Sequence, residues 1–188
     1  MVKTFSRVFP QTHPKAGQPT TFVEQIWNSQ NIKVEGETFI YPMDIDDIVR
    51  LNPDRDLITT SVFMSTIQNR TVLQNSKGHT IRSIPKNGKK IKVGDKISPR
   101  VWSGKPYFSK QITIFEPLEI VKVWDIKIEG FSIWINNKIF SVSHKSEDVK
   151  LLAKNDGLDI LDFWGWFPPT PGSFFVGQII CWDNTINY

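Results

Sequence analysis

Lys77 and Thr80 are residue types whose spacing could support catalysis. They lie three residues apart in the hexapeptide Lys77-Gly78-His79-Thr80-Ile81-Arg82. A threonine hydroxyl is a poor nucleophile until a base takes its proton. An ordinary lysine, with a pKa of about 10.4, is almost fully protonated at pH 7. Burial lowers a lysine pKa by several units and would make the pair competent. A surface lysine beside a strand threonine explains the same spacing, so both interpretations stay open.

A carboxylate could orient such a pair or shuttle its proton, and Asp156 is a candidate. It precedes Gly157 at a predicted break between two helices, where a side chain can point away from its own helix. Capping is the alternative role. Asp156, Asp159 and Asp162 repeat every three residues, and a solvated helix face is typical for at least two of them.

Positive charge is concentrated in one band of the chain. Residues 77–110 hold ten Lys or Arg and one acid, Asp95, whereas the whole chain has a net charge of +4. This asymmetry indicates an anionic partner, with RNA, DNA or a nucleotide as the first candidate. Solvated loop lysines are the alternative for Lys86, Lys89, Lys90 and Lys92.

Two aromatic residues alternate with a cation in the turn Trp102-Ser103-Gly104-Lys105-Pro106-Tyr107. Such a loop can stack a base and hold its phosphate, although a core tryptophan beside an ordinary hairpin has the same pattern. A guanidinium such as that of Arg82 can clamp a phosphate or carboxylate through two hydrogen bonds. The predicted ligand-binding residues are Arg82, Lys89, Lys90, Arg100, Trp102, Lys105 and Tyr107.

Length and composition favour one domain with a real core. The chain has 188 residues, of which 39% are hydrophobic. Its one cysteine, Cys181, fits a reducing compartment. The amino-terminal residues lack the apolar segment of a signal peptide, and no apolar run approaches the ~20 residues of a membrane span. We therefore expect a cytoplasmic protein. The histidines and the cysteine show no metal-ligand spacing, no glycine-rich phosphate loop is present, and we predict no cofactor.

The hydrophobic pattern predicts an α+β fold, a small mixed β-barrel with flanking helices. We expect a loop-rich entry over residues 1–20, then a helix capped by Thr20 or Thr21, with Glu24 reaching back. A hairpin around Gly36 and a helix at 57–68 follow. We predict strands at 97–101, 111–115, 118–123, 131–135, 138–142 and 174–182, with a turn at Asn136-Asn137. Helices are expected from Ser143 or Ser146 to Lys154 and over 158–166.

Taken in order, these features resemble the ASCH domain of the PUA-like superfamily. The resemblance is carried by Lys77-x-x-Thr80-Ile81-Arg82, then Val93-Gly94-Asp95, then Ala153-x-x-Asp156 and an apolar last strand, with 21–27 as the preceding helix. It implies a single ASCH or PUA-like domain over 1–188, with 1–19 as an extension and 28–74 as an insertion. The amino-terminal segment and the 102–107 turn look like ASCH-related proteins of bacteriophages, which places the protein in a bacterial or phage-infected cell.

The resemblance also implies an activity. N(4)-acetylcytidine amidohydrolases of this kind use a lysine, a threonine and a glutamate. On that pattern Thr80 is the nucleophile, Lys77 its base, and Asp156 the acid that positions them. Aspartate is one methylene shorter than glutamate, which is a departure from the family pattern. The alternative is a non-catalytic RNA- or DNA-binding or phage accessory protein with a vestigial pocket. The oligomeric state is left open.

Overall fold

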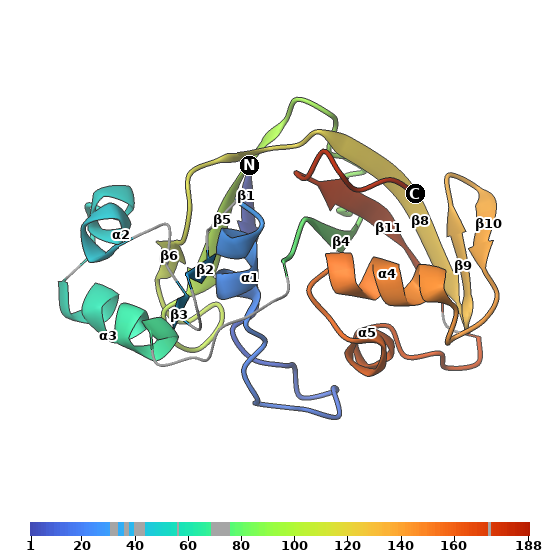
Figure 1. Ribbon diagram of the computed structural model, residues 1–188, viewed down its shortest axis with the longest axis horizontal. Coiled ribbons are helices and arrows are strands. Elements are labelled where there is room, and N and C mark those ends of the chain that lie inside the picture. Colours follow the sequence, from blue (N-terminus) through green and yellow to red (C-terminus); the bar gives the residue numbers. More distant parts are fainter. Residues whose placement is uncertain (31–33, 36–37, 40–43, 56, 69–75, 173) are drawn as a thin grey trace. The chain divides into compact units, whose positions relative to one another are not determined.

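The computed structural model describes residues 1–30, 34–35, 38–39, 44–55, 57–68, 76–172 and 174–188. This part of the chain contains helices and strands in a mixed order, so the predicted α+β class is confirmed (Figure 1). The chain divides into two compact units. Unit 1 comprises Met1–Phe9, Gln18–Ser76 and Lys96–Leu118, and unit 2 comprises Pro10–Gly17, Lys77–Asp95 and Glu119–Tyr188.

Unit 1 is built on a sheet in the order β1-β5-β6. Strand β1 (Val2–Thr4) runs parallel to β5 (Lys96–Trp102), and β6 (Gln111–Thr113) pairs antiparallel with β5. Strand β7 (Leu118–Glu119) also pairs with β5. Side chains alternate along β5, so that Ile97 and Val101 are buried while Arg100 and Trp102 lie on the other face.

The described residues of unit 1 also form the helices α1 (Phe22–Asn28), α2 (Ile45–Leu51) and α3 (Leu57–Gln68), and the antiparallel pair β2 (Val34–Glu35) and β3 (Thr38–Phe39). The buried Trp27 indole of α1 donates to the Ile114 carbonyl at 2.7 Å. Asn52, which ends α2, accepts from the Thr113 amide at 2.8 Å and donates to its carbonyl at 3.0 Å. These bonds fix α1 and α2 to the strand segment around β6.

Unit 2 contains a five-stranded antiparallel sheet in the order β10-β9-β8-β11-β4. The strands are β4 (His79–Ser83), β8 (Lys122–Glu129), β9 (Ser132–Ile135), β10 (Lys138–Ser141) and β11 (Phe174–Cys181). Strand β11 pairs with β4 on one side and with β8 on the other, so it holds β4 within the sheet.

Helices α4 (Glu147–Asn155) and α5 (Ile160–Trp166) contact one another, and α4 also contacts β10 (Figure 1). Both begin at a capping side chain, with Ser146 accepting from the Val149 amide and Asp159 accepting from the Asp162 amide. Gly157 follows α4 with a φ of 77°, a left-handed conformation that favours glycine and ends the helix. The buried residues of this region include Leu152 and Phe163.

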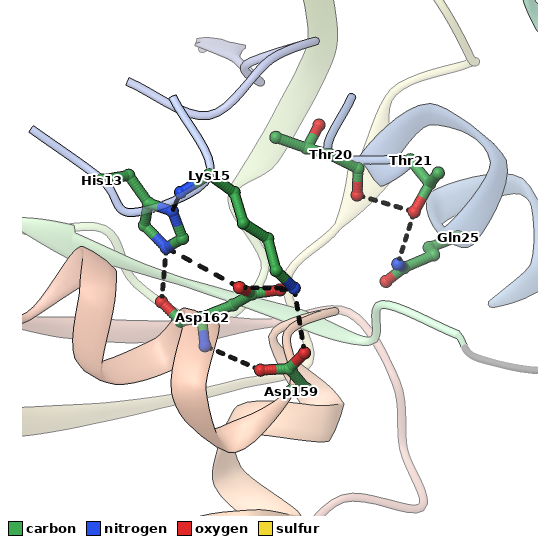
Figure 2. Close-up of polar contacts among 7 residues, drawn as sticks. All are labelled: His13, Lys15, Thr20, Thr21, Gln25, Asp159 and Asp162. Carbon is green, nitrogen blue, oxygen red and sulfur yellow. Dashed lines mark hydrogen bonds and ion pairs between the residues drawn. The ribbon is translucent and has the colours of Figure 1, made fainter. Parts of the chain in front are cut away.

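The segment Pro10–Gly17 belongs to unit 2, where it packs on α5. The Lys15 ammonium bonds the carboxylates of Asp162 at 2.8 Å and Asp159 at 3.2 Å (Figure 2). The buried His13 ring accepts from the Lys15 amide at Nδ1, so Nε2 carries the proton and donates to the Asp162 carbonyl at 3.1 Å. Asp162 is therefore buried in a polar cluster, whereas the Asp159 side chain is 55% exposed. Because Asp156 is buried as well, the predicted solvated face for at least two of the three aspartates is wrong.

Most predicted elements are present, with some corrections. The helix at 57–68 has the predicted bounds, and Asn136 and Asn137 turn a hairpin with φ values of 49° and 62°. The strand predicted at 118–123 is instead two strands, β7 and the longer β8. Of the two predicted caps of α1, Thr20 accepts from the Phe22 amide at 3.5 Å, whereas the cap at Thr21 is wrong. Thr21 has a left-handed φ of 58° and no side-chain capping bond; its hydroxyl donates to the Thr20 carbonyl and accepts from the side-chain amide of Gln25 (Figure 2).

The sheets of the described residues follow open paths, and no closed barrel is found among them. The single domain with an extension at 1–19 and an insertion at 28–74 stays a prediction. Over the described ranges no helix is long and apolar enough to cross a membrane. In the same ranges no group of His, Cys, Asp and Glu side chains is arranged to hold a metal ion.

Candidate functional site

The centre of the candidate site is a buried contact between Lys77 and Asp156, both in unit 2. The Lys77 ammonium donates to the Asp156 carboxylate at 2.5 Å and also to the Asp156 main-chain carbonyl. Lys77 is 1% exposed and Asp156 is 4% exposed. The structure thus brings together two residues that lie 79 positions apart in the sequence.

The local backbone explains the contact between Lys77 and Asp156. Asp156 ends α4, so its carbonyl is among those left without a helical partner, and a cation there complements the helix dipole. Gly78, next to Lys77, donates to the Asn155 carbonyl at 3.1 Å and accepts from the Trp182 amide at 3.0 Å. A Cβ at Gly78 would lie 2.6 Å from the Ile186 side chain and 2.9 Å from that of Asp183, so glycine is needed for the close approach.

Burial controls the ionisation of the pair. It lowers the pKa of Lys77 from 10.5 to about 8, against the opposing effect of the Asp156 carboxylate. Burial likewise raises the pKa of Asp156, while Lys77 and Arg82 act in the opposite direction. With a pKa of about 8, roughly one lysine in ten is neutral at pH 7, against about one in 2,500 for a free side chain. Lys77 therefore has the burial that a lysine needs to act as a base near neutral pH.

Thr80 lies on β4, opposite Ile180 of β11, and is 3% exposed. Because side chains alternate along a strand, Thr80 shares its face of β4 with Arg82, whereas His79 and Ile81 lie on the other. Arg82 acts on both members of the buried pair: it lowers the pKa of Lys77 and of Asp156. Thr80 therefore lies on β4, three residues after Lys77 in the chain.

Sequence reasoning missed a second polar group beside the pair. His79 Nδ1 lies 3.8 Å from the Asp156 carboxylate, and His79 Nε2 is 2.7 Å from the Tyr188 hydroxyl. Burial holds the pKa of His79 well below its usual value, with Lys77 acting in the same direction, so the ring is neutral at pH 7. The Tyr188 hydroxyl also accepts from the side-chain amide of Asn155 at 2.9 Å. His79 was visible in the hexapeptide, but nothing in the sequence pointed to Tyr188.

The remaining predicted binding residues are divided between the two units. Lys89 is exposed in the loop after β4, and Lys90 pairs with Asp125 at 2.7 Å with its side chain 45% exposed. Arg100, Trp102, Lys105 and Tyr107 belong to unit 1. The basic band is thus shared between two units, and within it Lys77 is buried and Arg82 is half-buried. The positive charge of the band is therefore not carried by exposed side chains alone.

Comparison of the chain with models of protein families found no match, and the comparisons with curated proteins and with solved structures also found none.

Proposed function

We propose that this chain is an ASCH-like, PUA-like barrel protein of the cytoplasm that binds a nucleoside or nucleic acid and hydrolyses an amide on a modified nucleoside such as N(4)-acetylcytidine. The observation that carries the proposal is the buried Lys77–Asp156 contact, in which the pKa of Lys77 is about 8. Buried ion pairs seldom add net stability. Strongly perturbed pKa values cluster at functional sites.

In the proposed reaction, neutral Lys77 takes the proton of the Thr80 hydroxyl as the oxygen attacks the acetyl carbonyl carbon. The tetrahedral intermediate then collapses, the C–N bond breaks, and the leaving amine takes the proton from Lys77. Water hydrolyses the resulting ester and frees Thr80. Asp156 holds the amine of Lys77 in place. Because Thr80 is 3% exposed, substrate binding must uncover its hydroxyl.

The test is incubation with N(4)-acetylcytidine, with release of cytidine followed by chromatography. Thr80→Val removes the hydroxyl at nearly constant shape and should abolish turnover. Thr80→Ser keeps a hydroxyl and should retain part of it. Ser83→Ala, at the exposed end of β4, is the control. Absence of turnover by the native chain, or turnover that survives Thr80→Val, would remove the amidohydrolase proposal.

The second candidate is non-catalytic binding of RNA or DNA, favoured by the exposed lysines of the loop after β4: Lys86, Lys89, Lys90 and Lys92. The pairing of Lys90 with Asp125 makes a sharp comparison possible. If this loop binds phosphates, Lys89→Gln should flatten the salt dependence of affinity by about 0.7 in log–log slope on a single strand. Lys90→Gln should change it less, since its charge is already compensated. Equal, salt-independent affinities would exclude the loop.

A further inference from the structure

Unit 1 contains a cavity that is separate in its residues from the Lys77 site. Its volume is about 280 Å³, and it is lined by residues 5–8 together with Trp102, Gly104 and Pro106. Small-molecule pockets usually span about 300–1,000 Å³, so this cavity suits one base-sized group rather than a large cofactor. The Trp102 ring lies 5.3 Å from the Tyr107 ring, centroid to centroid.

The loop that carries these rings is held by its own hydrogen bonds. Ser103 donates to the Lys110 carbonyl at 2.9 Å, and the amide and hydroxyl of Ser109 both donate to the Lys105 carbonyl at 3.0 Å. Tyr107 has a φ of 67°, a conformation that a tyrosine rarely adopts, so the rest of the loop must enforce it. The loop is therefore a preorganised platform.

This platform presents aromatic surface to solvent. Tyr107 is 86% exposed and Phe108 is 81% exposed, with the Lys105 ammonium 4.7 Å from the centre of the Phe108 ring. Adjacent exposed aromatic side chains are unusual without a partner. A cation beside exposed aromatic rings is a pattern that can hold a base and its phosphate.

The positive charge around the cavity indicates an anionic partner. Residues 1–9 and 96–115 of unit 1 contain six Lys or Arg and no Asp or Glu. Arg7, which lines the cavity, donates to the Ser103 carbonyl at 3.4 Å and lies 5.4 Å from the centre of the Phe63 ring. These contacts hold a guanidinium beside the aromatic cavity. Arg100 lies on the same face of β5 as Trp102.

We propose that the cavity beside Trp102 takes one base of a single-stranded RNA or DNA, stacked against Trp102 and Tyr107, with flanking phosphates at Arg7 and Lys105. Cations select a polyanion, and the exposed rings select a strand whose bases are unstacked. The proposal does not depend on the amide chemistry of unit 2.

The test is fluorescence anisotropy with labelled ten-nucleotide oligo-U RNA, oligo-dT DNA and a ten-base-pair duplex. Both single strands should bind more tightly than the duplex, and the ratio of their affinities shows whether the site prefers RNA. Tyr107→Asn removes the ring while tolerating the positive φ, and should weaken binding about 5- to 100-fold. Trp102→Leu should act in the same range, with circular dichroism to show that it folds. Phe174→Asn, at an exposed aromatic of unit 2, is the matched control and should bind normally.

Lys105→Gln should lower the log–log salt slope by about 0.7, and Lys145→Gln, at an exposed lysine of unit 2, should leave it unchanged. Ser83→Ala, at the exposed end of β4, should keep the native oligonucleotide affinity. Binding and hydrolysis are assayed separately on the native chain, so failure of one proposal is distinguished from failure of the other. The proposal is overturned if neither single strand binds at low salt, if the duplex binds as tightly as the strands, or if Tyr107→Asn binds within twofold of the native chain. Loss of binding in Phe174→Asn or Lys145→Gln, with Tyr107→Asn binding normally, would move the site to unit 2 and overturn it as well.

Discussion

Among the lysine–aspartate contacts of unit 2, those of Lys15 and Lys77 use the same residue types in opposite ways. The Lys15 side chain is 41% exposed, and its hydrogen bond to Asp162 raises the pKa of the lysine. The Lys77 side chain is 2% exposed, and burial lowers its pKa to about 8 in spite of Asp156. The difference shows that burial, rather than the presence of a carboxylate, decides whether a lysine is a permanent cation or a base near neutral pH.

The largest expected difference between the two contacts follows removal of each lysine. Lys77→Met leaves Asp156 buried without its ammonium partner, which should cost about 3–5 kcal/mol of stability and abolish amide hydrolysis. Lys15→Met disrupts a half-exposed contact and should cost about 1 kcal/mol without affecting hydrolysis. Urea unfolding of both variants measures the difference. Equal losses would show that the two contacts do not differ in the way described.

A double substitution sharpens this test. Lys77→Met combined with Asp156→Asn removes both charges, and an amide at 156 still accepts a hydrogen bond. Because the cost of Lys77→Met comes mainly from the stranded carboxylate, the double variant should recover about 2 kcal/mol or more of the loss. It should remain inactive. Unfolding in urea is the measurement, and a double variant less stable than Lys77→Met would show that the ionic contact itself stabilises the fold.

The packing of His13 on α5 gives a third prediction. A Cβ at Gly165 would lie 2.3 Å from His13 Nε2, so Gly165→Ala must displace the ring. Such overpacking typically costs about 1–3 kcal/mol. Limited proteolysis should cut faster within residues 10–17 of this variant. Gly104→Ala is the control, because its Cβ would meet Ser109 at an ordinary 3.5 Å. Unchanged cleavage and stability in Gly165→Ala would mean that the segment does not depend on this contact.

The smallest effects concern pH. The folded-state pKa of Lys77 lies below its unfolded value of 10.5, so the unfolded chain binds more protons between about pH 8 and 10.5. The contribution of Lys77 to stability therefore rises with pH across that window. Lys15 has a raised pKa, so its contribution is complete below 10.5 and is lost as pH rises through the folded value. Unfolding measured from pH 7 to 10 for each lysine variant against the native chain should show a contribution that rises with pH for Lys77 and stays level for Lys15. A level or falling contribution of Lys77 would contradict the assignment.

Local patterns predicted much of the fold. The bounds of α3, the Asn136-Asn137 turn and the capping serine of α4 follow from short-range rules that act within a few residues. Strand β8 was only partly predicted, although Asp125, Lys127 and Glu129 alternate with buried Ile126 and Ile128 along it. The predicted cap at Thr21 is wrong because this residue adopts a left-handed backbone, which the residue type alone does not indicate.

The site was predicted less completely. Spacing and the family resemblance pointed to Lys77 and Asp156, and the structure places them in contact. The roles of these residues, of Thr80 and of Arg82 stay predictions. Tyr188 reaches His79, and Asn155 reaches Tyr188, only through tertiary packing, so no sequence spacing indicates these contacts. The aromatic cavity combines residues 5–8 with a loop almost a hundred residues later, which was equally invisible.

The most direct test of whether burial makes Lys77 a base is an NMR titration of its side-chain nitrogen. The protein carries ¹⁵N-labelled lysine, and Lys77→Met assigns the resonance. The nitrogen resonance should change with a midpoint near pH 8, while that of Lys15 should titrate above 10.5. A midpoint for Lys77 at or above that of Lys15 would contradict the claim that burial turns this lysine into a base.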